Sequence, residues 1–224
     1  MDRDRIIDEI EAGICREAAA CGLTADAEVY AQCGRDHARP ILFAGSLDSR
    51  VAFLGRDLGR EEVKLGEPLI GGAGRRIRTS LYRCLLDREP ESGNRYMHEA
   101  TSQALLTNTV PFKPIGNKAY PAAIRERFRP YIERLLTCCW TGSTVITLGN
   151  EAFHWFAPYA EPGVLDELWQ RPDRYESSIA CIITSDRTAR NVLVAPLPHP
   201  SPQNVSWCAA FPGLLEKRLK AVFR

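Results

Sequence analysis

The chain of 224 residues has no CxxC pair among its eight cysteines, and no apolar run approaches the roughly 20 residues that a membrane-spanning helix needs. Without thiols at metal-ligand spacing a zinc site is disfavoured, and without an export signal a disulfide framework is disfavoured too. We therefore expect most cysteines to be buried apolar thiols. The charged N-terminus, MDRDRIIDEIE, does not resemble a secretory signal, so we expect a cytoplasmic protein.

Internal repeats, low-complexity segments and obvious linkers are also missing. Their absence favours one domain over residues 1–224, with residues 1–30 as an N-terminal helical extension. The formal net charge is only +1, so overall charge neither supports nor excludes a nucleic-acid partner. The expected state is a monomer without a membrane partner.

Short apolar segments rich in β-forming residues predict four strands, at 51–55, 104–110, 144–149 and 191–196. Their nearly continuous apolar character is typical of strands buried on both faces of a parallel sheet. Helical periodicity occurs at 4–20, 73–86, 122–138, 151–157 and 211–223. This alternation predicts a three-layer α/β/α fold around a central, mainly parallel four-stranded sheet. The arginines of the predicted helices are expected on solvated faces.

Three polar motifs follow predicted strands: GRDLG, TNTVPFKP and PHPSPQN. In an open parallel sheet, groups beyond the carboxyl ends of the strands meet at one edge, so Asp57, Asn108 and His199 are candidates for a shared site. A structural explanation remains open for each of them. Asp57 can cap a turn, Asn108 can be an ordinary turn residue, and His199 can lie in a rigid turn between prolines.

The first motif and the glycine-rich segment after it, GGAGRRIRTS at residues 71–80, lack two nucleotide-binding fingerprints. GGAGRRIRTS has no Lys-Ser/Thr pair where a Walker-type loop needs one, and GRDLGREE does not supply GxGxxG after the strand. Asp57, rather than the glycines, is therefore the chemically notable residue of this motif. In the second motif, the amide of Asn108 offers a donor and an acceptor together, which complements the edge of a nucleobase.

Together these motifs resemble those of the uracil-DNA glycosylase superfamily. HPSPQN resembles its HPSP motif, and the following Trp207 and LLEKRL are similar to its single-strand-selective branch. VAFLGRDLGREEVKLGEPLIGGAG resembles the GEAPG and GxPFxGxAG segments of its iron-sulphur branch. LLTNTVPFKP and ITLGNEAF resemble the TNVVKCRPP and LGxxA segments of that branch. The likeness runs from about Cys33 to the C-terminus.

The chain departs from the iron-sulphur pattern at the cluster ligands. Cys33 is retained, but Tyr30, Phe112 and Phe128 occupy the regions of the other expected cysteines. One ligand of four cannot hold a cluster, so we expect no metal and no cofactor, with a hydrophobic plug in its place. The acid also differs, since Asp57 stands one place after the glutamate of GEA, where the GQDPY motif of another branch has its aspartate.

The resemblance implies a role for each motif. Asp57 would polarise a water and stabilise the positively charged sugar, and His199 would donate a hydrogen bond to O2 of the base. Asn108 would read the base edge. Leu69 replaces the phenylalanine that stacks on the base, and Gln203 replaces the leucine that wedges into the duplex. The remaining expected substrate contacts are Gly55, Arg56 and Ser201, and the expected DNA contacts are Gly72, Gly74, Arg75, Arg76, Lys113, Gln203 and Asn204.

These roles predict a monofunctional DNA glycosylase that flips uracil or a related deaminated base out of single- or double-stranded DNA and hydrolyses its N-glycosidic bond. Lys113 is the one lysine of the three motifs, so a Schiff-base lyase step is not expected. Two alternatives stay open: a DNA-binding member that has lost catalysis, and a hydrolase of free nucleosides or nucleotides.

Overall fold

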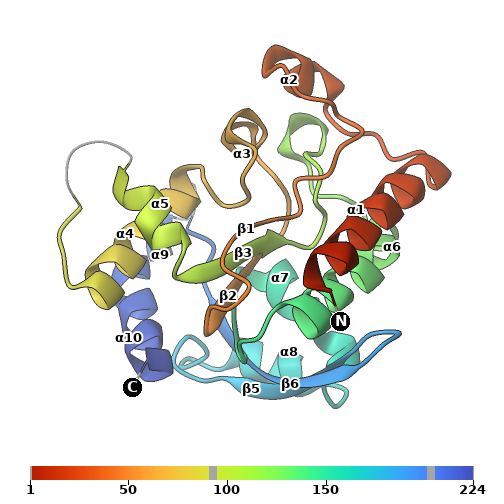
Figure 1. The fold of residues 1–224 in the computed structure, drawn as a ribbon. Coiled ribbons are helices and arrows are strands. Elements are labelled where there is room, and N and C mark those ends of the chain that lie inside the picture. The colour runs from red at the N-terminus through yellow and green to blue at the C-terminus, as the bar shows by residue number, and fades with distance from the viewer. Residues whose placement is uncertain (1, 91–94, 201–204, 224) are drawn as a thin grey trace.

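The computed structural model describes residues 2–90, 95–200 and 205–223. It contains a six-stranded sheet in the order β1-β3-β2-β4-β6-β5 (Figure 1). The inner strands β3, β2, β4 and β6 are mutually parallel, while β1 and β5 are antiparallel to their neighbours at the two edges. The strands are β1 Phe43–Gly45, β2 Val51–Gly55, β3 Ala104–Asn108, β4 Thr144–Leu148, β5 Ile179–Thr184 and β6 Ala189–Leu197.

The four predicted strands are confirmed as the parallel centre of the sheet, but the predicted number of four is wrong because two edge strands were missed. β1 has only three residues, too few to display a period of two. β5 alternates between exposed and buried residues, which is the pattern of an edge strand with one solvated face rather than of a doubly buried one.

Helices cover both faces of the sheet, which confirms the predicted three layers. In β2, Val51 and Phe53 pack into the cluster with helices α4 and α10, whereas Ala52 and Leu54 pack into the cluster with α1 and α6. Figure 1 shows the first group of helices on the left and the second on the right. The helices are α1 Arg3–Ala20, α2 Ala27–Gln32, α3 Arg60–Leu65, α4 Gly72–Leu86, α5 Arg95–Thr101, α6 Ala122–Arg134, α7 Asn150–His154, α8 Val164–Gln170, α9 Val205–Cys208 and α10 Phe211–Phe223, with shorter turns η1 Ile115–Asn117, η2 Leu135–Cys139 and η3 Ala157–Tyr159.

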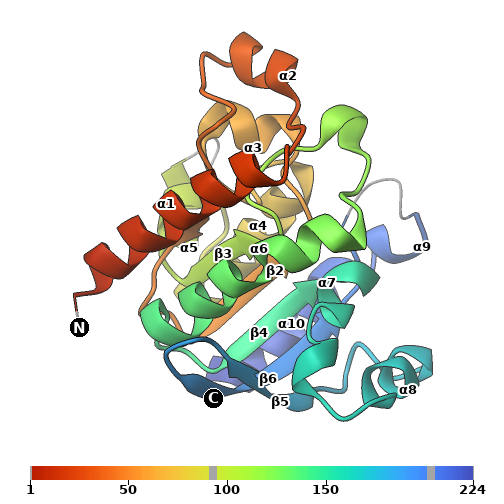
Figure 2. The same ribbon diagram turned by 90° about the vertical axis from the view of Figure 1, so that its right-hand side faces the viewer.

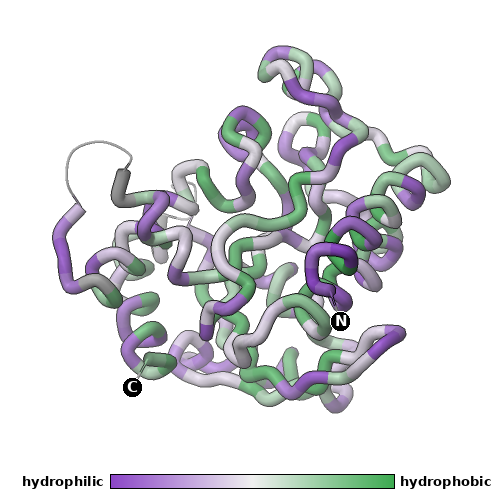
Figure 3. Tube along the Cα trace, viewed as in Figure 1, coloured by the Kyte–Doolittle hydropathy of each residue, from purple (hydrophilic) through white to green (hydrophobic). Residues whose placement is uncertain are grey.

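The amphipathic pattern at the N-terminus forms α1, which runs alongside α6 (Figure 2). Its apolar stripe of Ile6, Ile10 and Ile14 is buried against the core. Hydropathy along the chain follows the layers, with hydrophobic residues gathered along the central strands and hydrophilic ones on the outer helices (Figure 3). Within the described part of the chain, no helix combines the length and the apolar character required to cross a membrane.

Candidate active site

The three polar motifs lie at the carboxyl ends of the parallel strands. Gly55, the last residue of β2, pairs in register with Asn108, the last residue of β3. Backbone amides of Thr109 and Val110 donate to the carbonyls of Gly55 and Arg56 and so hold the first two motifs together. At the other side of β2, a Cβ placed on Gly149 after β4 would lie 3.2 Å from Cβ of His199. The sheet therefore brings the described residues of the three motifs to one edge.

Asp57 lies in the turn after β2, with only 4% of its side chain exposed. Its Oδ2 accepts a hydrogen bond from Nε of Arg56 at 2.9 Å, whereas its buried Oδ1 has no partner among the described residues. Burial raises the pKa of Asp57 to about 6, and the positive charge of Arg56 opposes that rise. The carboxyl group is therefore protonated at acid pH and ionised above about pH 6.

Asn108 is almost completely buried, and neither atom of its side-chain amide has a hydrogen-bond partner among the described residues. A Cβ on Gly55 would overlap Oδ1 of Asn108 and crowd Cδ2 of Leu69. Gly55 therefore leaves the space that this amide occupies. Buried polar groups without partners are few in folded proteins, and functional sites are one of the places where they occur.

His199 follows β6, between the buried prolines Pro198 and Pro200. The residue is exposed, yet the protein atoms around the imidazole and the positive charge of Arg56 lower the pKa of His199. A lowered pKa favours the neutral ring at neutral pH, which donates one hydrogen bond. Arg56 thus lies close enough to influence both the acid and the imidazole electrostatically.

Leu69 is held beside Gly55 by a buried arginine. Leu69 has a left-handed backbone with φ 52°, and its carbonyl accepts from Nη1 of Arg78. Nε of Arg78 also donates to Oγ1 of Thr101 at 2.7 Å. The expectation that the arginines of this helix are all solvated is wrong for Arg78, which is completely buried because the loop supplies acceptors for its guanidinium. Periodicity alone cannot reveal such acceptors.

The glycine-rich segment at residues 71–74 opens α4, as the expected DNA contact requires. A carboxylate of the protein lies against this segment. Glu62 accepts from the amide of Gly71 at 3.0 Å and from the amide of Gly59 at 3.1 Å. Gly74 is buried, and a Cβ there would overlap the carbonyl of Leu69. The space that this carbonyl takes up accounts for the glycine at position 74 without a DNA contact.

The remaining predicted DNA contacts differ in accessibility. Gly72 and Arg75 are exposed on the first turn of α4, and Arg76 donates to the carbonyl of Cys208 at 3.0 Å. The proposed contacts Ser201, Gln203 and Asn204 lie outside the described residues.

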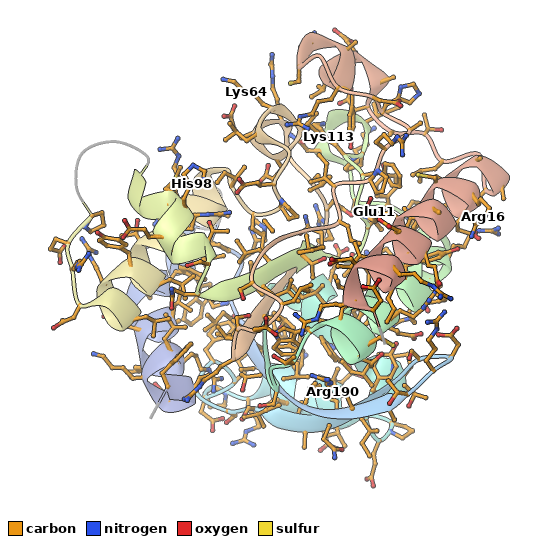
Figure 4. The ribbon with its side chains drawn as sticks, in the orientation of Figure 1. Glu11, Arg16, Lys64, His98, Lys113 and Arg190 are labelled. Carbon is orange, nitrogen blue, oxygen red and sulfur yellow. The ribbon has the colours of Figure 1, made fainter. Side chains whose placement is uncertain are left out.

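Lys113, a predicted DNA contact, lies in a buried ion pair. Its ammonium is buried, with Oδ2 of Asp26 at 2.7 Å and the carbonyl of Pro114 at 2.9 Å. Lys113 is labelled in Figure 4. A phosphate could reach this group only after the ion pair had been broken. The buried pair instead fixes the segment after β3 to the start of α2.

Aromatic side chains pack where the resemblance places cluster cysteines. The rings of Phe112 and Phe128 meet edge to face at 5.9 Å, and both are completely buried. The hydroxyl of Tyr30 accepts from the amide of Lys113 at 3.2 Å. No group of three or more His, Cys, Asp and Glu side chains suited to a metal ion occurs within residues 2–90, 95–200 and 205–223.

Three further residues near the acid were not predicted as site residues from the sequence: Tyr120, Glu151 and Arg125. Tyr120 is buried, and its hydroxyl has no partner in the described part of the chain. Burial, with a smaller contribution from the charge of Asp57, raises the pKa of Tyr120. Glu151 accepts from Nη1 of Arg56 at 3.1 Å and also contacts Arg125. These residues come from segments whose mutual approach leaves no local pattern.

Comparison with known proteins places this geometry in a family context. The family model described as "Uracil DNA glycosylase superfamily" matches residues 43–222. Among curated proteins, none matches the chain.

Proposed function

The chain belongs to the uracil DNA glycosylase superfamily, a family of DNA glycosylases, and on this premise we propose that it removes uracil or a related deaminated base from DNA by monofunctional hydrolysis. The observation that carries the proposal is a pair of buried polar groups at adjoining strand ends that have no hydrogen-bond partner among the described residues. One is the carboxylate oxygen of Asp57 and the other is the amide of Asn108. A carboxylate and a base-reading amide are the two groups that this chemistry needs in one place.

Breaking the N-glycosidic bond leaves positive charge on the sugar and negative charge on the departing base. The carboxylate of Asp57 is suited to the sugar, because its negative charge lies in a site that water penetrates poorly and is therefore weakly screened. It also accepts a proton from the attacking water as the C–O bond forms. Since the pKa of Asp57 is about 6, the carboxylate is in this form at neutral pH.

The base side of the reaction falls to Asn108 and His199. The amide of Asn108 donates to one atom of the base edge and accepts from its neighbour, and Gly55 leaves the space that this amide occupies. Leu69 offers the base an aliphatic contact in place of an aromatic ring. A neutral imidazole at His199 donates to the oxygen on which negative charge develops, and its lowered pKa supports that neutral form.

The extruded nucleotide needs contacts that hold its backbone. The exposed Gly72 and Arg75 on α4 remain candidates, with Arg76 after release of its carbonyl partner, and Ser201 in the HPSP motif. A lyase step is not part of the proposal, because the ammonium of Lys113 is bound by Asp26.

The proposal is tested with labelled oligonucleotides that carry uracil, hypoxanthine or xanthine, in single and double strands, beside free nucleosides. Base loss from DNA, measured as strand breakage after alkali, supports it, and the variant Asp57→Asn controls for a contaminating enzyme. Binding without base loss would indicate a member without catalysis. Release from free nucleosides alone would indicate a nucleoside hydrolase.

A further inference from the structure

Two arginines from distant segments converge on one carboxylate beside the proposed acid. Arg56 follows β2, Arg125 lies near the start of α6 and Glu151 lies in the first turn of α7. Nη1 of Arg56 donates to Oε1 of Glu151 at 3.1 Å, and Nη1 of Arg125 donates to Oε2. The two oxygens of Glu151 therefore bind different guanidinium groups. Arg56 simultaneously donates Nε to Asp57, so this bridge adjoins the proposed catalytic group.

The bridge is open to solvent, unlike the acid next to it. The side chains of Arg56 and Glu151 are each 37% exposed and that of Arg125 is 23% exposed, against 4% for Asp57. Ion pairs in contact with water contribute little to stability, so breaking one costs little free energy. A ligand from solution can therefore reach both arginines without unfolding the protein.

The balance of charges among these four side chains limits which ligand can bind. Arg56 and Arg125 are balanced by Asp57 and Glu151, so an additional anion would leave surplus negative charge beside the acid. An anion is accommodated only if Glu151 withdraws. Two guanidinium groups that bind separate oxygens of one anion suit a phosphate as well as a carboxylate.

From this geometry we propose that Glu151 is a resident anion in a two-arginine phosphate site, and that a phosphate of the substrate strand displaces it from Arg56 and Arg125. The inference rests on the proposed function, because the strand that supplies the phosphate is the one whose base is removed. The exchange leaves the hydrogen bond from Arg56 to Asp57 in place. The DNA backbone lies next to Asp57 only after a phosphate has replaced Glu151 on the two arginines. Binding of the strand therefore also aligns the nucleotide whose base is removed.

The test compares Glu151→Gln with Glu126→Gln. Both substitutions remove one negative charge, but Glu126 lies on α6 and its carboxylate binds Arg129 at 2.6 Å. Affinity for an undamaged single-stranded oligonucleotide is measured over a range of salt concentrations. We expect Glu151→Gln to bind several-fold more tightly than Glu126→Gln at low salt. Its dependence of log K on log salt should be steeper by about 0.7, the value for one additional phosphate contact on a single strand.

A third variant assigns the effect to the arginine pair. Adding Arg125→Gln to Glu151→Gln should return both the affinity and the salt slope to those of Glu126→Gln. Thermal unfolding of every variant identifies any that has lost its fold. An affinity and slope for Glu151→Gln equal to those of Glu126→Gln would overturn the inference. Tighter binding of inorganic phosphate alone, without tighter binding of DNA, would also overturn it, because the site would then take free phosphate.

Base release by the wild-type chain is measured separately, so that the two proposals fail in different ways. If the wild type releases uracil and the Glu151→Gln slope is unchanged, the phosphate exchange is wrong and the proposed function stands. If the slope steepens but no base is released, the phosphate site stands and the proposed chemistry is wrong.

Discussion

Asp57 should lower the stability of the folded protein at neutral pH, and its replacement by asparagine should reveal by how much. The pKa of Asp57 is about 6 in the folded protein, whereas an unperturbed aspartate has 3.8. Between these two values the folded state binds more protons than the unfolded state. The stability of the wild type relative to Asp57→Asn should therefore be greatest below about pH 4 and should fall as pH rises toward 6.

The size of the effect follows from the difference in pKa. About two pKa units at about 1.4 kcal/mol each give roughly 3 kcal/mol, so Asp57→Asn should gain about that much relative to the wild type between pH 4 and pH 7.5. Little solvent screening applies, because only 4% of the side chain is exposed. The same substitution should reduce base release by at least about tenfold, since losing a positioned acid or base commonly costs 10²–10⁴-fold.

Denaturant unfolding at several pH values provides the measurement, with Asp48→Asn as the matched control. Asp48 is exposed and bound to Arg3, which lowers the pKa of Asp48. The stability that Asp48 adds is lost only as pH falls below about 4, so Asp48→Asn should differ from the wild type by a nearly constant amount from about pH 4 to about pH 7.5. A stability difference between Asp57→Asn and the wild type that stays constant from pH 4 to pH 7.5 would refute the reasoning. Unchanged base release in Asp57→Asn would remove this carboxylate from the mechanism.

The remaining expectations concern the residues proposed to bind the base and the buried ion pair of Lys113 and Asp26. Gly55→Ala should abolish most base release, because the added methyl overlaps the amide of Asn108; if activity persists, the base does not bind at that strand end. His199→Ala should lower the rate of base release at least about tenfold while keeping the loss of activity below about pH 6 that protonation of the acid causes. Lys113→Met should destabilise the fold by about 3 kcal/mol in denaturant unfolding, because Asp26 loses its partner, with no change in the salt dependence of DNA binding. A reduced salt slope in that variant would restore Lys113 as a phosphate contact.

Local sequence was enough to identify the centre of the sheet. The strand at Val51–Gly55 has the predicted bounds because each of its residues is apolar and buried. The helix at Phe211–Phe223 also has the predicted bounds, since its apolar stripe repeats along a single element. The edge strands were missed because β1 is too short and β5 has one solvated face.

The motifs likewise predicted which strand ends carry polar groups, because the order of strands and helices brings the carboxyl ends of parallel strands to one edge. That is why Asp57 and Asn108 could be chosen from the sequence and lie at the ends of neighbouring strands. Their roles remain proposals, but their common location follows from the topology of the chain.

What each polar side chain binds was decided only by the tertiary structure. Lys113 was predicted to contact DNA but is buried against Asp26, and Arg78 was predicted on a solvated face but is buried beneath the loop of Leu69. Glu151 lies 95 residues from Arg56 in the chain, and no local pattern connects them. Periodicity reports which face of one element is apolar, whereas an ion pair, a buried amide or a shifted pKa depends on which distant segments pack against that element.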